Sequence, residues 1–395
     1  MSVTPAEQAV LDRIDEDLLV RVTSDLVRAT GQNPPGEEAA TVAVLAAAGR
    51  ELGLDVVTSP VEPGRDNVGI TLAGGNGPGL LLLGHTDVVP IGDGWTTDPF
   101  GGEVRDGRIY GRGASDMKGG LAAALVALAA LRGTELSGPV ELAAVVDEEE
   151  TGKGIRAYVA SAGGGSRSFL GCITAEPTDL QTIIAARGDS YLRVAIHGRA
   201  CHAGNPDDGA NAIYGAAAVV AEIERLHAEL AAAPHPLLGP ATWSVGQING
   251  GTGGSIVPAE CVIVADRRLL PGESPATVLD DLRTRVAALD LKSRGLTVDL
   301  DMPMEMPAFE TAADDALVVA TEAARLDAGG PALPLAGWTA ACDGGYVARD
   351  LDVPVVVLGP GSVTTEAHRA DESVPVAELI TAARTYALTA LRLLS

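Results

Sequence analysis

The chain has 395 residues, more than one ordinary hydrophobic core accommodates, so two domains are expected. Its formal net charge of −25 argues against a nucleic-acid partner and against an anionic membrane surface. The four cysteines lie far apart without a CxxC pair, so neither a disulfide framework nor a thiolate zinc site is indicated.

The N-terminal stretch bears on location. Residues 1–17 are polar and acidic, without the basic and apolar runs of a secretory signal. The apolar run 121–131 is too short and too rich in alanine to span a membrane. We therefore expect a cytoplasmic protein with reduced cysteines.

The first half of the chain alternates between helical and strand-like patterns. Helices are predicted over 6–30, 36–53, 117–132 and 154–162. Strands are predicted over 55–58, 67–72, 80–83, 140–146 and 172–175, with a hairpin over 103–110. This alternation predicts an α/β fold with a mixed, largely parallel sheet flanked by helices.

The pattern changes near residue 187. The order becomes strand, helix, strand, strand, helix, strand, over 191–197, 209–232, 242–249, 256–266, 275–289 and 296–302. That order is typical of a two-layer α+β unit, and helix–strand alternation returns after about residue 304. We predict a catalytic domain of residues 1–186 plus 304–395 and an inserted lid or dimerisation domain of residues 187–303.

Acidic and histidine residues end several of the predicted strands. In open α/β sheets, ligands gather at the carboxyl ends of the strands. Imidazoles and carboxylates gathered there would hold two divalent cations, and paired cations catalyse hydrolysis. The candidates are His85, Asp87, Asp116, Glu148, Glu149, Glu176 and His368.

Each candidate also has an ordinary structural interpretation. His85 with Asp87 can be a core histidine beside a turn, Asp116 a helix N-cap, and the acidic run 147–150 a solvated loop. The metal interpretation is favoured because ligand-type residues end one strand after another. Within it, His85 is a ligand and Asp87 orients its ring by accepting the second N–H. Asp116 has two oxygens that can bridge cations roughly 3.5–4 Å apart.

The remaining candidates are Glu148, Glu149, Glu176 and His368. Glu148 and Glu149 are adjacent and point different ways, so that one can bind metal while the other moves protons. Glu176 ends a strand, and His368 follows a glycine-rich turn.

The motifs, taken together, resemble the zinc-dependent exopeptidase and deacylase family of acetylornithine deacetylase, succinyl-diaminopimelate desuccinylase, aminoacylase and glutamate carboxypeptidase. The resemblance spans about residues 80–376 in the family's order. The matching motifs are GHTDVVP, YGRGASDMKGG, VDEEETGKG, AEP, GRACHAGNPDDGANAI, DRRLLPG, GPG and AHRADE. It implies a catalytic domain interrupted by a smaller one. It also implies two divalent metal ions, of zinc or, in its place, cobalt or manganese.

The resemblance also implies roles. Its ligand set is Asp116 as the bridge, His85 and Glu176 for one metal, and Glu149 and His368 for the other. Glu148 becomes the general base, which takes a proton from the attacking water and returns it to the leaving amine. A cis peptide bond is expected at Asp116–Met117.

Four further residues are implied in substrate contact. His202 matches a histidine that reaches the partner subunit's site in family dimers and steadies the oxyanion, which predicts a homodimer. Arg268 fits the arginine that clamps a substrate carboxylate. Arg187 and Asn211 are additional candidates.

Departures from the family patterns bear on the substrate. Ser255 stands where Asn is usual, and the segment 342–345 lacks the arginine of the desuccinylases. The segment 359–362 followed by Ala-His resembles the acetylornithine deacetylases. We predict a two-metal amide hydrolase that removes a short acyl group from an N-acylated amino acid. A dipeptidase or carboxypeptidase acting on short peptides with the same site remains open, as does an inert metal-binding recognition module.

Overall fold

The computed structural model describes residues 3–163 and 168–395. Residues 1–2 and 164–167, which fall in the predicted catalytic domain, lie outside the described residues. The chain divides into two compact units. The first comprises Met1–Ile184, Glu310–Gly337 and Cys342–Ser395, and the second comprises Ala185–Phe309 and Trp338–Ala341. The lid and dimerisation roles of residues 187–303 stay predictions.

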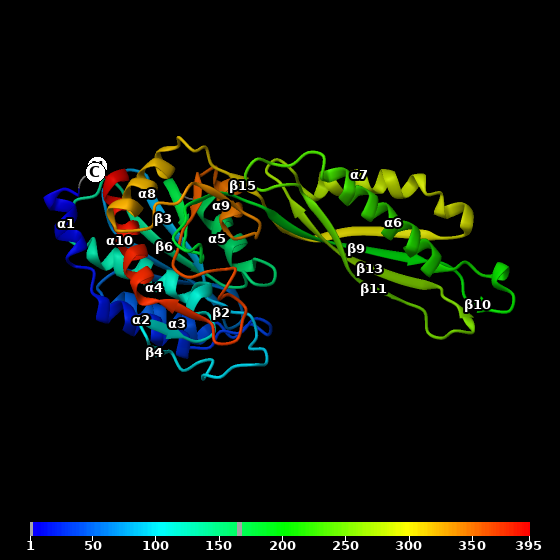
Figure 1. The fold of residues 1–395 in the computed structure, drawn as a ribbon, viewed down its shortest axis with the longest axis horizontal. Coiled ribbons are helices and arrows are strands. Elements are labelled where there is room, and N and C mark those ends of the chain that lie inside the picture. Colours follow the sequence, from blue (N-terminus) through cyan, green and yellow to red (C-terminus); the bar gives the residue numbers. More distant parts are fainter. Residues whose placement is uncertain (1–2, 164–167) are drawn as a thin grey trace. The chain divides into compact units, whose positions relative to one another are not determined.

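The first unit is built on a mixed sheet with a parallel centre (Figure 1). The central strands, which run parallel, are β6 (Val140–Val145), β3 (Gly79–His85), β7 (Phe169–Thr174) and β17 (Val355–Val357) in spatial order. One side continues antiparallel through β2 (Arg65–Leu72) and β1 (Asp55–Glu62). The other side continues through β8 (Ile183–Ala186), with β15 (Phe309–Glu310) and β16 (Ala336–Trp338). The predicted α/β class with a largely parallel sheet is confirmed.

Helices flank this sheet. They are α1 (Pro5–Leu11), α2 (Glu16–Arg28), α3 (Ala39–Glu51), α4 (Gly119–Ala130), α5 (Lys153–Gly163), α8 (Ala316–Asp327), α9 (Gly344–Leu351) and α10 (Val376–Leu393). α3 packs against β1 and β2, and α10 packs against α4 and α8. A small separate sheet joins β4 (Glu103–Arg105), β5 (Arg108–Tyr110) and β18 (Ser373–Pro375).

Two local predictions have different outcomes. The single helix predicted over 6–30 is wrong, because α1 ends at Leu11 and Asp15 then caps α2 by accepting the Leu18 N–H. The helical spacing of apolar residues continues across the break, so the sequence pattern did not indicate that the helix ends there. The hairpin predicted over 103–110 is confirmed, with φ of 52° at Asp106 and 73° at Gly107, as such a tight turn requires.

The packing of α4 positions the turn that precedes it. β3 and β6 are buried along their whole length, as strands in the centre of a parallel sheet are. The start of α4 passes very close to the chain beyond β7, where a Cβ on Gly120 would lie 2.0 Å from the Ala175 carbonyl oxygen. Only glycine permits this approach. It brings the turn Ala114–Lys118 beside the end of β3.

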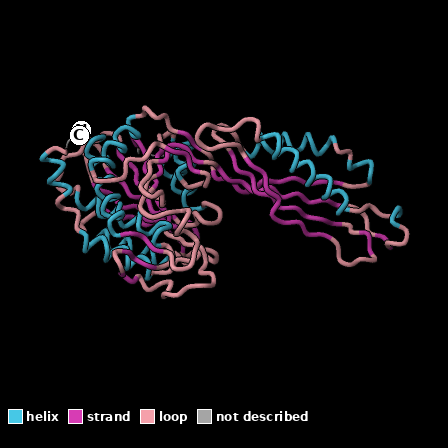
Figure 2. The backbone as a smooth tube through the Cα atoms, viewed as in Figure 1, coloured by secondary structure: helices cyan, strands magenta, loops and turns pink. Residues whose placement is uncertain are grey.

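The second unit is a two-layer α+β structure. Its antiparallel sheet has the spatial order β11 (Thr242–Gly250), β13 (Glu260–Leu269), β9 (Gly188–His197) and β14 (Thr297–Met306). The helices α6 (Ala212–Leu230) and α7 (Pro275–Ala288) cover one face of this sheet (Figure 2). The core between the layers includes Leu192, Val194, Ile196, Val219, Ile223, Ile263 and Leu282. A separate ladder pairs β10 (Cys201–His202) with β12 (Ile256–Val257).

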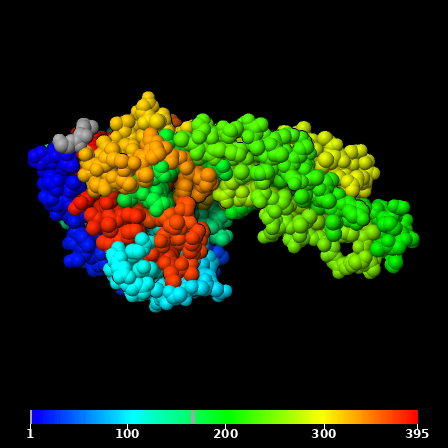
Figure 3. Space-filling model, in the orientation of Figure 1, coloured from blue at the N-terminus to red at the C-terminus, as the bar shows by residue number. Residues whose placement is uncertain are grey.

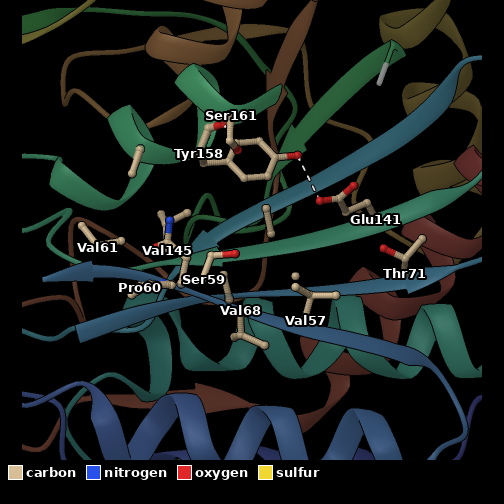
Figure 4. Close-up of a pocket in the computed structure, with 15 residues that line it drawn as sticks. Val57, Ser59, Pro60, Val61, Val68, Thr71, Glu141, Val145, Tyr158 and Ser161 are labelled. Carbon is tan, nitrogen blue, oxygen red and sulfur yellow. Dashed lines mark hydrogen bonds between the residues drawn. The ribbon is translucent and has the colours of Figure 1, made fainter. Parts of the chain in front are cut away.

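A cavity of about 440 Å³ opens over β1, β2 and β6 beside α5 (Figure 4). Gly69 and Ala143, which are paired between β2 and β6, are among the residues that line it. At its wall the Tyr158 hydroxyl donates to Glu141 Oε1 at 3.2 Å. None of the predicted site residues, all of which the structure describes, lines this cavity.

Among the helices of residues 3–163 and 168–395, none combines the length and apolar character that crossing a membrane requires.

Candidate metal centre

His85 ends β3 and is almost fully buried. Its Nδ1 lies 2.9 Å from the main-chain oxygen of Asp87, so this nitrogen carries the donated proton. Its Nε2 faces the carboxylates, 3.3 Å from Asp116 Oδ1 and 3.8 Å from Glu176 Oε1. The Asp87 carboxylate lies farther from Nδ1, at 3.5 Å. The ring is thus oriented chiefly by the Asp87 main chain.

Asp116 lies between the two histidines. Its Oδ1 faces His85, and its Oδ2 lies 3.3 Å from His368 Nε2. The same nitrogen of His368 lies 3.3 Å from Glu149 Oε2. The peptide bond Asp116–Met117 is cis, as expected from the resemblance.

These contacts form two groups that share one residue. In each group the possible ligand atoms lie within 4.8 Å of one another. The groups are His85, Asp116 and Glu176, and Asp116, Glu149 and His368. An aspartate with one oxygen toward each group is suited to bridge two cations.

The electrostatics of this cluster fit divalent cations. Burial raises the pKa of the Glu176 carboxyl and of the Glu149 carboxyl, because it removes the water that would stabilise their charged forms, and the nearby histidines offset this only in part. Burial also acts on Asp116, but hydrogen bonds from His368 and His85 outweigh it and lower the pKa of that carboxyl. The Oε1 of Glu149 is buried without a hydrogen-bond partner among the described residues. A cation would offset this concentration of buried negative charge.

Glu148 belongs to neither group. Its side chain is buried, which raises the pKa of its carboxyl; His85 opposes this shift, and the negative charge of Glu176 adds to it. Its main-chain N–H donates to Asp87 Oδ1 at 3.2 Å, and that of Glu149 donates to Asp87 Oδ2 at 3.1 Å. Asp87 therefore holds the Glu148–Glu149 main chain as well as contacting His85.

Sequence analysis missed the residues that support this arrangement. Asn33 Nδ2 donates to Asp87 Oδ2 at 2.9 Å and to Asp147 Oδ1 at 3.1 Å. Arg65 Nη2 lies 2.9 Å from Asp147 Oδ1 and also pairs with the buried Glu38. Asp147 has φ of 69°, a left-handed conformation that turns the chain just before Glu148. The acidic run was the only sequence signal, because Asn33 and Arg65 are distant in the chain.

The predicted substrate-contact residues all belong to the second unit, and each has contacts within it. His202 is exposed, and its Nδ1 accepts the Gly204 N–H at 2.9 Å. Asn211 caps α6, with its Oδ1 accepting the N–H groups of Ile213 and Tyr214.

The two arginines lie near each other. Arg187 donates to the main-chain oxygen of Leu238, and burial followed by repulsion from Arg268 lowers its pKa. Arg268 Nη2 lies 3.0 Å from Asp266 Oδ2 and 3.5 Å from Asp189 Oδ2. A substrate carboxylate at Arg268 would therefore share the guanidinium with two aspartates. The substrate roles of these residues stay predictions.

Two His–carboxylate groups that share an aspartate are the arrangement of two-metal hydrolases. The family model for peptidase family M20/M25/M40 matches residues 81–392, and the chain belongs to this family. An acetylornithine deacetylase of Salmonella arizonae is 31% identical over 377 residues, covering 91% of this chain and 94% of that protein. The chain is a metal-dependent hydrolase.

Solved structures agree on the fold. A metallo-carboxypeptidase of the M20 family from Sulfolobus solfataricus matches with a TM-score of 0.77 at 19% identity, covering 94% of this chain and 98% of that one. A dinuclear metal-binding peptidase of the same family from Bacillus subtilis matches with a TM-score of 0.74 at 17% identity, covering 96% and 98%.

Proposed function

We propose that the chain is a two-metal amide hydrolase that removes the acyl group from an N-acylated amino acid. The observation that carries this proposal is the pair of ligand groups that share Asp116, with Glu148 beside them and in neither. The identity of 31% to an acetylornithine deacetylase supports an acyl amino acid as the substrate.

The ligand groups assign the metals. His85, Asp116 and Glu176 would hold one ion, and the group Asp116, Glu149 and His368 would hold the other. When bound, divalent ions supply Lewis acidity and lower the pKa of a water molecule toward about 7. Zinc suits histidine and carboxylate ligands, and cobalt or manganese could replace it.

Glu148 would move the proton. Its carboxylate would accept a proton from the attacking water and return it to the leaving amine, and burial, which raises the pKa of this carboxyl, favours that uptake. The hydrogen bond from its main-chain N–H to Asp87 holds the backbone of Glu148 in place. The general base is thereby held by the same residue that contacts His85.

The proposal extends to substrate and assembly. Arg268 would bind the free carboxylate of the substrate, with Arg187 and Asn211 as further contacts. His202 would act across a homodimer to stabilise the oxyanion. A cytoplasmic location completes the proposal.

Turnover of a substrate panel tests the proposal. Metal-loaded protein should hydrolyse N-acetyl amino acids faster than dipeptides. Hydrolysis of dipeptides alone would instead support the dipeptidase or carboxypeptidase function, which would use the same residues. Tight ligand binding without hydrolysis of any amide would identify an inert recognition module.

A further inference from the structure

One buried carboxylate lies at the centre of the glycine-rich turn before α4. Glu372 is 1% exposed. Its Oε2 accepts from Arg112 Nη1 at 2.8 Å and from the Gly113 N–H at 3.0 Å. Its Oε1 accepts from the N–H groups of Ser115 at 2.9 Å and Asp116 at 3.0 Å. We name this set, Glu372 with Arg112 and the three N–H groups, the Glu372 clasp.

The turn is shaped to receive an anion. Gly113 has φ of 81°, and a Cβ there would lie 2.4 Å from Val88 Cγ1, so glycine is required. Main-chain N–H groups that converge in this way form a nest for negative charge. The anion in this nest is the carboxylate of Glu372, which lies 256 residues beyond Asp116 in the same chain.

The clasp joins segments that are distant in the chain. Arg112 Nη1 also donates to the Arg369 carbonyl oxygen at 3.2 Å. Nearby, the Asp371 carboxylate accepts the N–H and hydroxyl groups of both Thr96 and Thr97. Figure 3 shows these regions as neighbouring cyan and orange-red atoms on the surface of the first unit. The loop of residues 366–372 is therefore fixed to the turn 111–116 through Glu372 and Arg112, and to a second segment, Thr96 and Thr97, through Asp371.

The two metal groups depend on this clasp to different extents. In the group His85, Asp116 and Glu176, the ends of β3 and β7 position His85 and Glu176, and only Asp116 bonds to Glu372. In the other, Asp116 bonds to Glu372, and His368 lies on the same loop, four residues before it. The His368 side chain is 53% exposed, against 2% for His85, so packing holds it less.

We propose that Glu372 is a positioning residue that selectively sets the metal affinity of the group Asp116, Glu149 and His368. The inference rests on the proposed two-metal function. By tying the Asp116 main chain to the loop of His368, the clasp holds both ligands near each other before an ion binds. An ion then does not have to order the loop. Loss of such outer partners typically weakens metal binding by about 10–100-fold.

Calorimetric titration of the metal-free full chain with Co²⁺ tests this proposal, with visible absorption of the bound ion as a second readout. The wild type should bind two ions. Glu372→Gln places an amide N–H₂ against N–H donors and should weaken one site by about 10–100-fold while the other keeps its affinity. Arg112→Lys keeps the charge but loses the forked geometry, so the same site should weaken less.

Glu366→Gln is the matched control. Glu366 lies in the same loop, but it pairs with Arg108 and accepts from Ser373, with no hydrogen bond to the turn 111–116 among the described residues. This variant should bind two ions as the wild type does.

The outcomes separate the two proposals. A wild type that binds fewer than two ions would overturn the two-metal function and the clasp with it. If the wild type binds two ions, unchanged sites in both Glu372→Gln and Arg112→Lys overturn only the clasp. Equal weakening of both sites overturns its selectivity. If Glu372→Gln does not fold, Arg112→Lys alone decides by the same criteria.

Discussion

The two units differ in how they position residues that carry chemistry. In the first unit, the predicted ligands lie within a few ångströms of one another, whereas in the second unit His202, Asn211, Arg187 and Arg268 each bond to neighbours of their own. Parallel strands all end at one edge of the sheet, so ligand-type residues at the ends of β3, β6 and β7 meet there. Antiparallel strands end alternately at opposite edges, and no such rule gathers the residues of the second unit.

The largest expected effect is at the residue shared by both metal groups. Asp116→Ala removes one ligand from each group, so both ions should be lost and hydrolysis should fall to background. The metal content per chain after dialysis, measured by inductively coupled plasma mass spectrometry, checks this expectation. Two retained ions per chain would show that Asp116 is not the bridge.

The next effect separates binding of metal from movement of the proton. Glu148→Ala should keep both ions but lower kcat by about 10²–10⁴-fold, because it removes the general base and no ligand. Steady-state kinetics alongside metal content checks it. Glu150→Ala, an exposed acid of the same run, should leave kcat unchanged and serves as the control. Wild-type turnover in Glu148→Ala would contradict the assignment of Glu148 as the general base.

The smallest effect addresses the second unit. His202→Ala should lower kcat by about 10²–10³-fold without loss of metal, if this histidine stabilises the oxyanion. His197→Ala, which alters another solvent-accessible histidine of the unit that pairs with Asp299, should have little effect on kcat. A kcat of His202→Ala as high as that of His197→Ala would mean that His202 supplies no such donor. The residues that carry chemistry would then all lie in the first unit, as far as these variants test it.

Much of the fold and of the candidate metal centre could be predicted from the sequence. β3 is an apolar run that ends in His85, and β6, apolar except for Glu141, ends two residues before the acidic run 147–150, so the strand-end rule pointed to His85, Glu148 and Glu149. The class of sheet followed from the alternation of strands and helices. The break between α1 and α2 was missed because apolar spacing runs through it.

The supporting network could not be predicted in the same way. Asn33 lies 54 residues before Asp87, and Glu372 lies 257 residues after Ser115. Hydrogen bonds across such separations leave no local periodicity or spacing in the sequence. Glu372 stood within a motif of the resemblance, but its partners became visible only when the turn 111–116 was placed beside it.

The central claim is that two ions share Asp116. Anomalous diffraction at the zinc edge, from a crystal grown with ample zinc, tests it most directly. The account predicts two peaks, one among His85, Asp116 and Glu176 and one among Asp116, Glu149 and His368. A single peak, or peaks that Asp116 does not contact, would contradict it.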